Sequence, residues 1–265
     1  MTSDRPLLVT GALYGSLAYL FLFSPVLVLL LFSFQDGQLP IPPLKGLTLR
    51  WYAQVLADRQ IMTALANSLL VAFSSAGLAC LMGFLAAYGL ARYRLPWRGG
   101  LGWLILAPAT ISYLIIAMGL MVTFGAVGLP RSLFSVIVGH VVINLPIAFA
   151  LIYSQLGAHQ LNIERAARDL GAGEVSLLLL IVVPSLLPAL VAAFALCFSL
   201  SWDEFIIAFL LSQFEVTLPV EIWSSLRSGL NPAINAAGTL VFGLSLGLFL
   251  LALTFVLARR GLRND

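Results

Sequence analysis

The sequence predicts an all-α integral membrane protein with six transmembrane helices. Of its 265 residues, 61% are hydrophobic and 9% are charged, whereas soluble domains average about 45–50% apolar and about 25% charged residues. Six apolar stretches reach the length of about 20 residues that a membrane-spanning helix needs. The polar stretches between them are too short for a separate soluble domain, so we expect one transmembrane domain over residues 1–265.

The predicted spans cover residues 8–34, 61–93, 100–127, 132–156, 180–211 and 233–257. The first apolar run is too long for a removable signal peptide and lacks a small-residue cleavage site, so we expect it to be retained. Proline is tolerated in membrane helices where neighbouring helices satisfy the freed backbone groups, and Pro108 is expected to kink or begin a helix. Cys80 and Cys197 lie in apolar runs and are expected to be packing residues.

The distribution of basic residues predicts the orientation. Cytoplasmic loops of membrane proteins carry an excess of lysine and arginine. With both termini in the cytoplasm, most of the arginines fall on the cytoplasmic side, including Arg92, Arg94 and Arg98 after the second span. This orientation also places the loop at residues 158–180 in the cytoplasm.

The segments outside the membrane are expected to hold short helices. In the loop at residues 35–60, a surface helix over 47–58 would be anchored at the interface by Trp51 and Tyr52. Another short helix is expected near Pro219, because proline fits the first turn of a helix. Within the second span, Ala79, Gly83, Ala87 and Ala91 repeat every four residues, a spacing that favours close packing on another helix.

The fourth span contains two polar residues on one face. His140 and Asn144 are four residues apart, so their side chains project from the same side of a helix. They either face a translocation path or form an interhelical hydrogen bond, and the sequence leaves both open. Tyr113 in the third span is a further polar-tipped candidate. The second histidine, His159, lies in a predicted cytoplasmic loop, so no metal site is expected.

Two adjacent acids, Asp203 and Glu204, lie within the fifth apolar stretch. A charge at the centre of a span costs about 2.5–3.5 kcal/mol on insertion scales, so such residues face protein or water and indicate a functional site. In a continuous helix, Ser199 and Asp203 would share a face and Glu204 would point about 100° away. One acid would then face a path while the other makes a structural pair, and which does which stays open. Alternatively, both acids are interfacial caps.

The densest group of charges lies between residues 160 and 188. It predicts a helix, a turn at Gly171 and Gly173, and a second helix that enters the membrane. Gly171 is expected to cap the first helix in the left-handed conformation. Pairs four residues apart support the first helix; they are Glu164 with Arg168 and Arg165 with Asp169.

This segment resembles the "EAA" loop of bacterial ABC-importer permeases, which reads Glu-Ala-Ala, three residues, Gly, nine residues, then Ile-x-Leu-Pro. The matching positions are Ala166, Ala167, Gly171, Ile181 and Pro184. Arg165 stands where the pattern has Glu, with Glu164 one position earlier, and Val183 replaces Leu. The resemblance implies the type I ABC-importer permease fold and a coupling helix that docks into an ATPase subunit. The docking residues would be Glu164, Arg165, Ala166, Ala167, Arg168, Asp169 and Gly171.

Residues 201–239 are similar to the spermidine/putrescine branch of these permeases, and to the second permease of its pair. The matching phrases include Ser-Trp-Asp-Glu at 201–204 and Asn-Pro-Ala-Ile-Asn-Ala at 231–236. The resemblance implies an inner-membrane importer with two ATP-binding subunits, a second and different permease, and a periplasmic or lipid-anchored solute-binding protein. It implies no role for nucleic acid.

The chain is not expected to be an enzyme or to hold a cofactor. It has no glycine-rich phosphate loop followed by Lys-Ser or Lys-Thr, so ATP and Mg²⁺ are expected in the partner ATPase. A path for a polycation needs carboxylates and aromatic rings. We expect it to be lined by Asp203, Glu204, Trp202, Tyr113, His140, Asn144 and Trp223.

Three alternative functions remain. The first is an ABC permease for another organic cation or small solute; an anion is disfavoured because no arginine lies deep in a span. The second is a self-contained secondary transporter or channel, which would often show internal repeats that this sequence lacks. The third is a membrane-embedded sensor or interaction subunit without a transport role.

Overall fold

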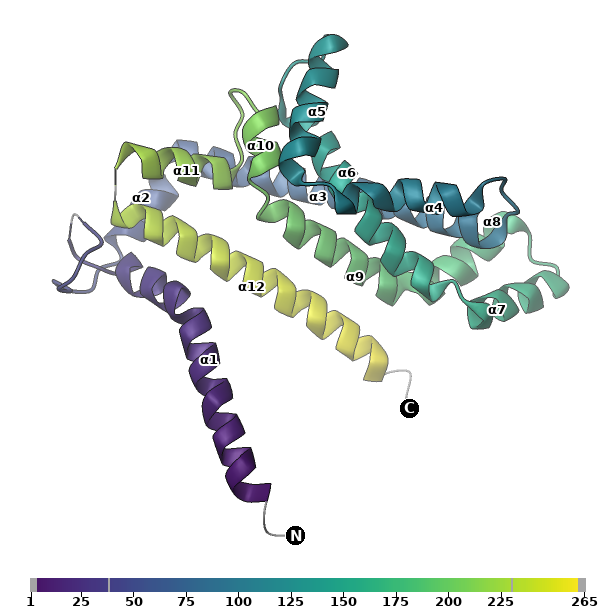
Figure 1. Ribbon diagram of the computed structural model, residues 1–265, viewed down its shortest axis with the longest axis horizontal. Coiled ribbons are helices and arrows are strands. Elements are labelled where there is room, and N and C mark those ends of the chain that lie inside the picture. The colour runs from purple at the N-terminus through teal and green to yellow at the C-terminus, as the bar shows by residue number, and fades with distance from the viewer. Residues whose placement is uncertain (1–3, 38, 230, 262–265) are drawn as a thin grey trace. The chain divides into compact units, whose positions relative to one another are not determined.

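The computed structural model describes residues 4–37, 39–229 and 231–261, and the secondary structure of this part is helical (Figure 1). Its contacts divide the chain into two compact units, residues 1–62 with 222–243 and residues 63–221 with 244–265. The helices are α1 (Asp4–Ser33), α2 (Arg50–Ala57), α3 (Arg59–Arg92), α4 (Arg98–Leu106), the 3-10 helix η1 (Ala107–Thr110), α5 (Tyr113–Ala126), α6 (Leu133–Gln155), α7 (Ala158–Asp169), α8 (Glu174–Leu177), the π-helix η2 (Leu178–Val182), α9 (Val183–Trp202), α10 (Ile206–Leu211), α11 (Leu218–Ser228) and α12 (Pro232–Gly261).

Four segments of the described chain are long and apolar enough to cross a membrane: Thr10–Ser33, Arg59–Arg92, Leu133–Gln155 and Glu174–Trp202. A fifth is possible if the bent pair Arg98–Thr110 and Tyr113–Ala126 counts as one span. In α12, the apolar stretch found within the described residues is Pro232–Gly247, and this stretch is shorter than a full membrane span. The chain is therefore a multi-pass membrane protein, while the number of six spans stays a prediction.

Two of the expected spans differ from straight helices. The segment at 100–127 is bent by 106° between η1 and α5. Pro108 lies in η1, and because proline cannot donate a backbone hydrogen bond, it ends a regular helix at this point. The segment at 180–211 is interrupted after Trp202, and α10 is a separate helix. The expectation of one continuous fifth helix carrying both acids was wrong.

In the first unit, α2 packs on the beginning of α12. Trp51 is 7% exposed, lies in an apolar cluster with Val55, Ala233, Ala236 and Ala237, and donates from Nε1 to the carbonyl of Gln35 at 2.7 Å. The expected surface helix over 47–58 is thus present as α2. Trp51, however, is a buried packing residue rather than an interfacial anchor.

In the second unit, α6 and α9 lie side by side (Figure 1), and α3 approaches α6 through small residues. A Cβ on Gly83 would lie 2.9 Å from the backbone nitrogen of Phe149 and 3.0 Å from Cβ of Ala148. Ala79 and Ala87 on the same face are fully buried. The predicted small-residue face therefore packs against another helix of the same chain.

Candidate functional site

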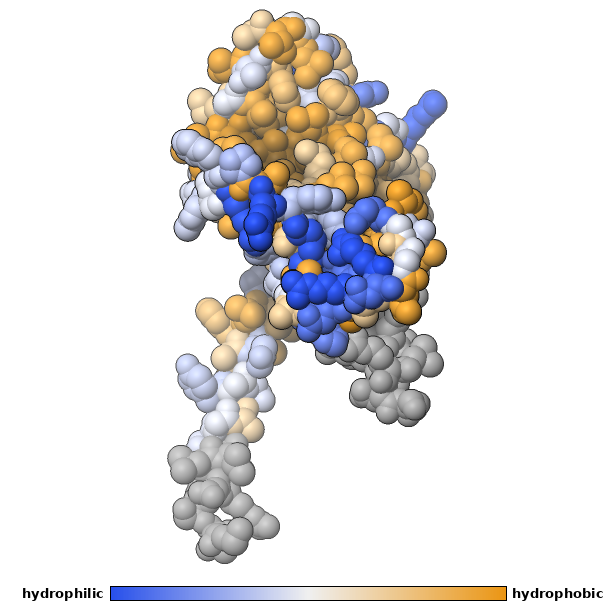
Figure 2. Space-filling view, turned by 90° about the vertical axis from the view of Figure 1, so that its right-hand side faces the viewer, coloured by the Kyte–Doolittle hydropathy of each residue, from blue (hydrophilic) through white to orange (hydrophobic). Residues whose placement is uncertain are grey.

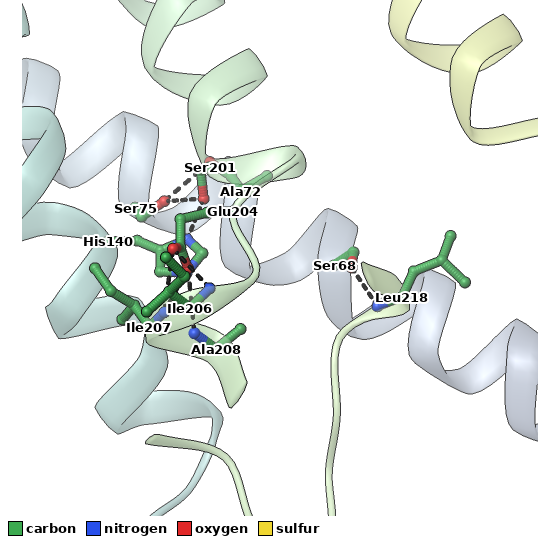
Figure 3. A network of polar contacts seen from close by, with 10 residues as sticks. All are labelled: Ser68, Ala72, Ser75, His140, Ser201, Glu204, Ile206, Ile207, Ala208 and Leu218. Atoms are coloured by element: carbon green, nitrogen blue, oxygen red, sulfur yellow. Dashed lines mark hydrogen bonds and ion pairs between the residues drawn. The ribbon is translucent and has the colours of Figure 1, made fainter. Parts of the chain in front are cut away.

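The break between α9 and α10 is made by the side chain of Glu204 (Figure 3). Its Oε1 accepts hydrogen bonds from the backbone nitrogens of Ile206 at 2.8 Å and Ile207 at 3.1 Å. Its Oε2 accepts from Ile207 at 2.9 Å and Ala208 at 3.2 Å. These are the N–H groups that a helix start leaves without a partner. A side-chain cap on α10 therefore replaces the backbone bonds that would have continued α9.

Glu204 also belongs to a buried polar network that joins four helices. His140 of α6 lies with Nε2 3.4 Å from Oε2 of Glu204 and with Nδ1 2.6 Å from Oγ of Ser201 at the end of α9. Ser201 Oγ is in turn 2.9 Å from Oγ of Ser75 on α3. Figure 3 shows these side chains converging beside the start of α10. The network fixes the α9–α10 break to α3 and α6.

The hydroxyl of Ser75 also donates to the carbonyl of Ala72 at 3.3 Å. Nε2 of His140 lies close to Oε2 of Glu204, but within the described residues it has no hydrogen-bond partner. His140 is fully buried and Glu204 is 5% exposed, so an unpaired charge here would be costly. The backbone N–H groups of α10 supply the main compensation for the charge of Glu204.

The two adjacent acids have different environments. Asp203 follows the last residue of α9 and is exposed, whereas Glu204 is buried. Glu204 makes structural contacts by capping α10, while the path role expected for one of the two acids stays a prediction. Asp203 is the exposed carboxylate of the two.

The other expected path residues are not gathered at one exposed surface. Trp202 is 2% exposed and stacks on Phe198 with ring centroids 6.2 Å apart. Asn144 is fully buried, and within the described residues neither side-chain polar atom has a hydrogen-bond partner. Tyr113 is partly buried against the apolar cluster that α3, α5, α6, α10 and Val220 of α11 form. Trp223 lies on α11, in the first unit, and is 45% exposed.

His140 was expected either to face a translocation path or to form an interhelical hydrogen bond. The structure shows the interhelical hydrogen bond, between Nδ1 of His140 on α6 and Ser201 on α9. Its partners Ser75 and Ser201 were not predicted from the sequence, nor was Ser68, whose Oγ accepts from the backbone nitrogen of Leu218 at 2.8 Å (Figure 3). The spacing of Ser68 and Ser75 could have indicated that they share a helix face, because they are seven residues apart. Ser75 also lies one turn before Ala79 on the small-residue face of the second span.

A second site is the helix pair α7 and α8. Figure 2 faces the end of the second unit where these helices lie, and hydrophilic residues gather there beside hydrophobic surface. On α7, Glu164 and Ala167 are buried, whereas Arg165, Ala166 and Asp169 are exposed. The exposed residues form the outer face of the helix.

Glu164 binds an arginine far away in the sequence rather than Arg168, the partner expected from helix spacing. Arg92 at the end of α3 donates from Nε to Oε2 and from Nη2 to Oε1, both at 2.8 Å. Its Nη1 donates to the carbonyl of Leu156, just after α6, at 3.0 Å. Arg168 instead donates to Oε1 of Glu174 at 3.0 Å across the turn. This hydrogen bond with Glu174 raises the pKa of the Arg168 guanidinium.

The turn between α7 and α8 has the glycine cap that the sequence predicts. Gly171 has φ +86°, a conformation that glycine adopts without a Cβ penalty. Its nitrogen donates to the carbonyl of Arg168 at 2.9 Å, and the nitrogen of Ala172 donates to that of Ala167 at 3.0 Å. Together these bonds form a Schellman motif, so α7 ends at a defined point and the chain direction into α8 is fixed.

The chain is similar over most of its length to known transport permeases. No protein-family model matches the chain. It is 34% identical over 235 residues to the putrescine transport system permease protein PotI of Escherichia coli (strain K12), covering 86% of this chain and 83% of that protein. It is 30% identical over 236 residues to the spermidine/putrescine transport system permease protein PotC of Haemophilus influenzae, covering 88% and 91% of the two chains.

The fold is also that of a solved transporter. A chain of the bacterial alginate ABC transporter, crystallised with an alginate-bound periplasmic protein, aligns with a TM-score of 0.73 at 18% identity over 94% of this chain and 93% of that chain. The two relatives confirm the resemblance to spermidine/putrescine permeases that the sequence indicates. The chain belongs to the family of putrescine and spermidine/putrescine ABC-transporter permease proteins.

Proposed function

We propose that the chain is the transmembrane permease subunit of an ATP-driven importer for a polyamine such as putrescine or spermidine, and forms half of its translocation path. The observation that carries this proposal is the exposed carboxylate of Asp203, at a helix break held in place by buried neighbours. The names of the two relatives support the substrate class.

The chemistry of a polyamine suits this arrangement. Each ammonium group loses water when it enters a narrow path, and an exposed carboxylate replaces part of that hydration. Asp203 would take this role. Glu204 and His140 would hold the break, because the carboxylate of Glu204 and Nδ1 of His140 are already hydrogen-bonded within the chain. Asn144 and Trp202 are likewise buried, so they would support the path from behind.

Aromatic rings supply a second contact for an organic cation, at about 0.5–2 kcal/mol for each well-placed ring. Tyr113 is partly exposed and Trp223 is 45% exposed. Each is proposed as a separate contact for the solute. Trp202, stacked on Phe198, is proposed instead to shape the end of α9.

The energy for transport would come from partner subunits. We propose that α7 is the coupling helix and that its exposed face, with Arg165, Ala166 and Asp169, docks into an ATP-binding subunit that holds ATP and Mg²⁺. Leu170, 89% exposed at the end of α7, gives this surface an apolar point of contact. With Arg165 in the Glu position of the family pattern, the shape of the turn up to Gly171 would contribute much of the docking.

The assembled importer would contain two such ATP-binding subunits, this permease, a second and different permease, and an external solute-binding protein. The chain would form one domain with six spans and lie in the bacterial inner membrane with both termini in the cytoplasm. The arginines near the expected cytoplasmic ends of the spans support this orientation.

Uptake by the reconstituted complex tests the proposal. Proteoliposomes that contain all subunits should accumulate labelled putrescine or spermidine only when ATP and the binding protein are supplied. Accumulation without ATP would indicate a secondary transporter. ATP-dependent uptake of a sugar or an amino-acid derivative, with no polyamine uptake, would keep the importer and change its substrate.

A further inference from the structure

The face of α7 that packs against the rest of the second unit is mostly polar. Its buried residues are Gln160, Glu164 and Ala167, of which Glu164 is the deepest at 0% exposed. A helix usually attaches to its protein through an apolar stripe. Of the three buried side chains, two are polar and the third is that of an alanine, so polar contacts contribute to the position of α7 beside the partly buried Leu161.

The strongest of these contacts is the ion pair with Arg92. The side chains of Arg92 and Glu164 are 7% and 0% exposed, and two parallel hydrogen bonds of 2.8 Å join them. This two-point geometry fixes orientation as well as distance. Because Arg92 also donates to Leu156, one guanidinium connects the end of α3, the end of α6 and the middle of α7.

From Arg92, α3 continues without interruption to the polar network at the α9–α10 break. It is one helix of 34 residues, and Ser75 lies 17 positions before Arg92, a distance of about 26 Å at about 1.5 Å per residue. Ser75 contacts Ser201 at 2.9 Å, and Ser68, two turns earlier, caps α11 through Leu218 at 2.8 Å. Figure 3 shows Ser68 and Ser75 on this helix.

We propose that Arg92 is a positioning residue for coupling: it locks α7 to α3, and α3 carries the displacement of α7 to the break at Asp203 and Glu204. This inference rests on the proposed function at one point, namely that α7 is the helix that docks on an ATP-binding subunit. The close approach at Gly83, where α3 meets the backbone of α6, favours movement of the two helices as one body.

The test follows a reporter near the break. In the assembled complex, a cysteine at Ser199, an exposed position one turn before Asp203, is labelled with a small thiol reagent with and without a non-hydrolysable ATP analogue. The native Cys80 and Cys197 are buried, so their labelling should be slow. The variants are Arg92→Gln, Glu164→Gln, the double variant and Arg94→Gln, an exposed neighbour that serves as the matched control.

We expect the ATP analogue to change the labelling rate in the wild-type background and in Arg94→Gln by the same factor. Each single variant of the pair should abolish the change, because it leaves one buried group unpaired. In the double variant, two neutral amides face each other. This variant should recover much of the change in labelling rate that the ATP analogue causes.

Three results would overturn the inference: a wild-type reporter that does not respond to the analogue, a full response in Arg92→Gln, or a double variant as unresponsive as the single variants. If Arg92→Gln fails to assemble, the double variant decides in its place, and its failure to assemble or respond counts against the inference. Uptake of putrescine by the wild-type complex is measured separately, so a wrong substrate class and a wrong coupling route give different results.

Discussion

Asp203 and Glu204 are adjacent in the chain, yet Asp203 is exposed while Glu204 is 5% exposed with both carboxylate oxygens bound to the backbone of α10. This difference separates an acid whose carboxylate is bound within the chain from an acid whose carboxylate is exposed. Glu204 caps the start of α10, whereas Asp203 follows directly after the end of α9.

Glu204→Ala should destabilise the second unit more than Glu204→Gln. Alanine removes the cap of α10, and loss of a helix cap costs about 0.5–2 kcal/mol, whereas the amide oxygen of glutamine still accepts one backbone hydrogen bond. Thermal unfolding of the purified chain in detergent measures both variants. Glu215→Gln, at an exposed acid before α11, is the control and should unfold like the wild type. Equal stability of Glu204→Ala and wild type would contradict the capping role.

Gly83→Ala should weaken the packing of α3 on α6. The new Cβ would lie 2.9 Å from the backbone nitrogen of Phe149, and overpacking of this kind typically costs about 1–3 kcal/mol. Gly89→Ala on the same helix has no atom within 4 Å of its new Cβ, so it should leave the unfolding temperature unchanged. If the two variants unfold alike, the helices do not approach as closely as described.

Gly171→Ala should reduce copurification of the ATP-binding subunit. A side chain at φ +86° is strained by roughly 1–2 kcal/mol, which would loosen the end of α7. Gly173 has φ −71° and no atom within 4 Å of an added Cβ. Gly173→Ala should therefore copurify the ATPase normally. A loss in Gly173→Ala as large as that in Gly171→Ala would exclude backbone strain as the cause.

The two ion pairs near α7 should differ in strength. Glu164→Gln breaks a buried pair with Arg92, and such a loss costs about 3–5 kcal/mol. Glu174→Gln breaks an exposed pair with Arg168, whose side chains are 35% and 64% exposed. Salt screens such a pair, so any effect on the unfolding temperature should disappear at high ionic strength. The effect of Glu164→Gln should persist there, and its disappearance would show that the pair is not buried.

Much of the architecture could be predicted because long apolar stretches and the spacing of glycines are local signals. The lengths of α1, α3 and α6, the short helix α2 and the cap at Gly171 follow from residues close in sequence. The end of α9 was missed because Asp203 and Glu204 lie in an otherwise apolar run. Only the folded chain shows that the side chain of Glu204 reaches the backbone of residues 206–208.

The partners of charged residues were the least predictable part of the site. Helix spacing suggested Arg168 as the partner of Glu164, but a partly exposed pair of this kind contributes little. The structure instead pairs Glu164 with Arg92, 72 positions away in sequence. No local pattern specifies such a contact, because it depends on how α3 and α7 pack. The same holds for Ser75 and Ser201, which are 126 positions apart.

The most direct measurement for the central claim is the initial rate of ATP-dependent putrescine uptake by proteoliposomes containing the complete complex with Asp203→Asn. We expect a fall of at least about tenfold, equivalent to about 1.4 kcal/mol, with Asp203→Glu retaining most of the rate and Glu215→Gln unchanged. Copurification of all subunits should be normal in each variant. Wild-type uptake in a fully assembled Asp203→Asn complex would contradict the claim that this carboxylate serves the translocation path.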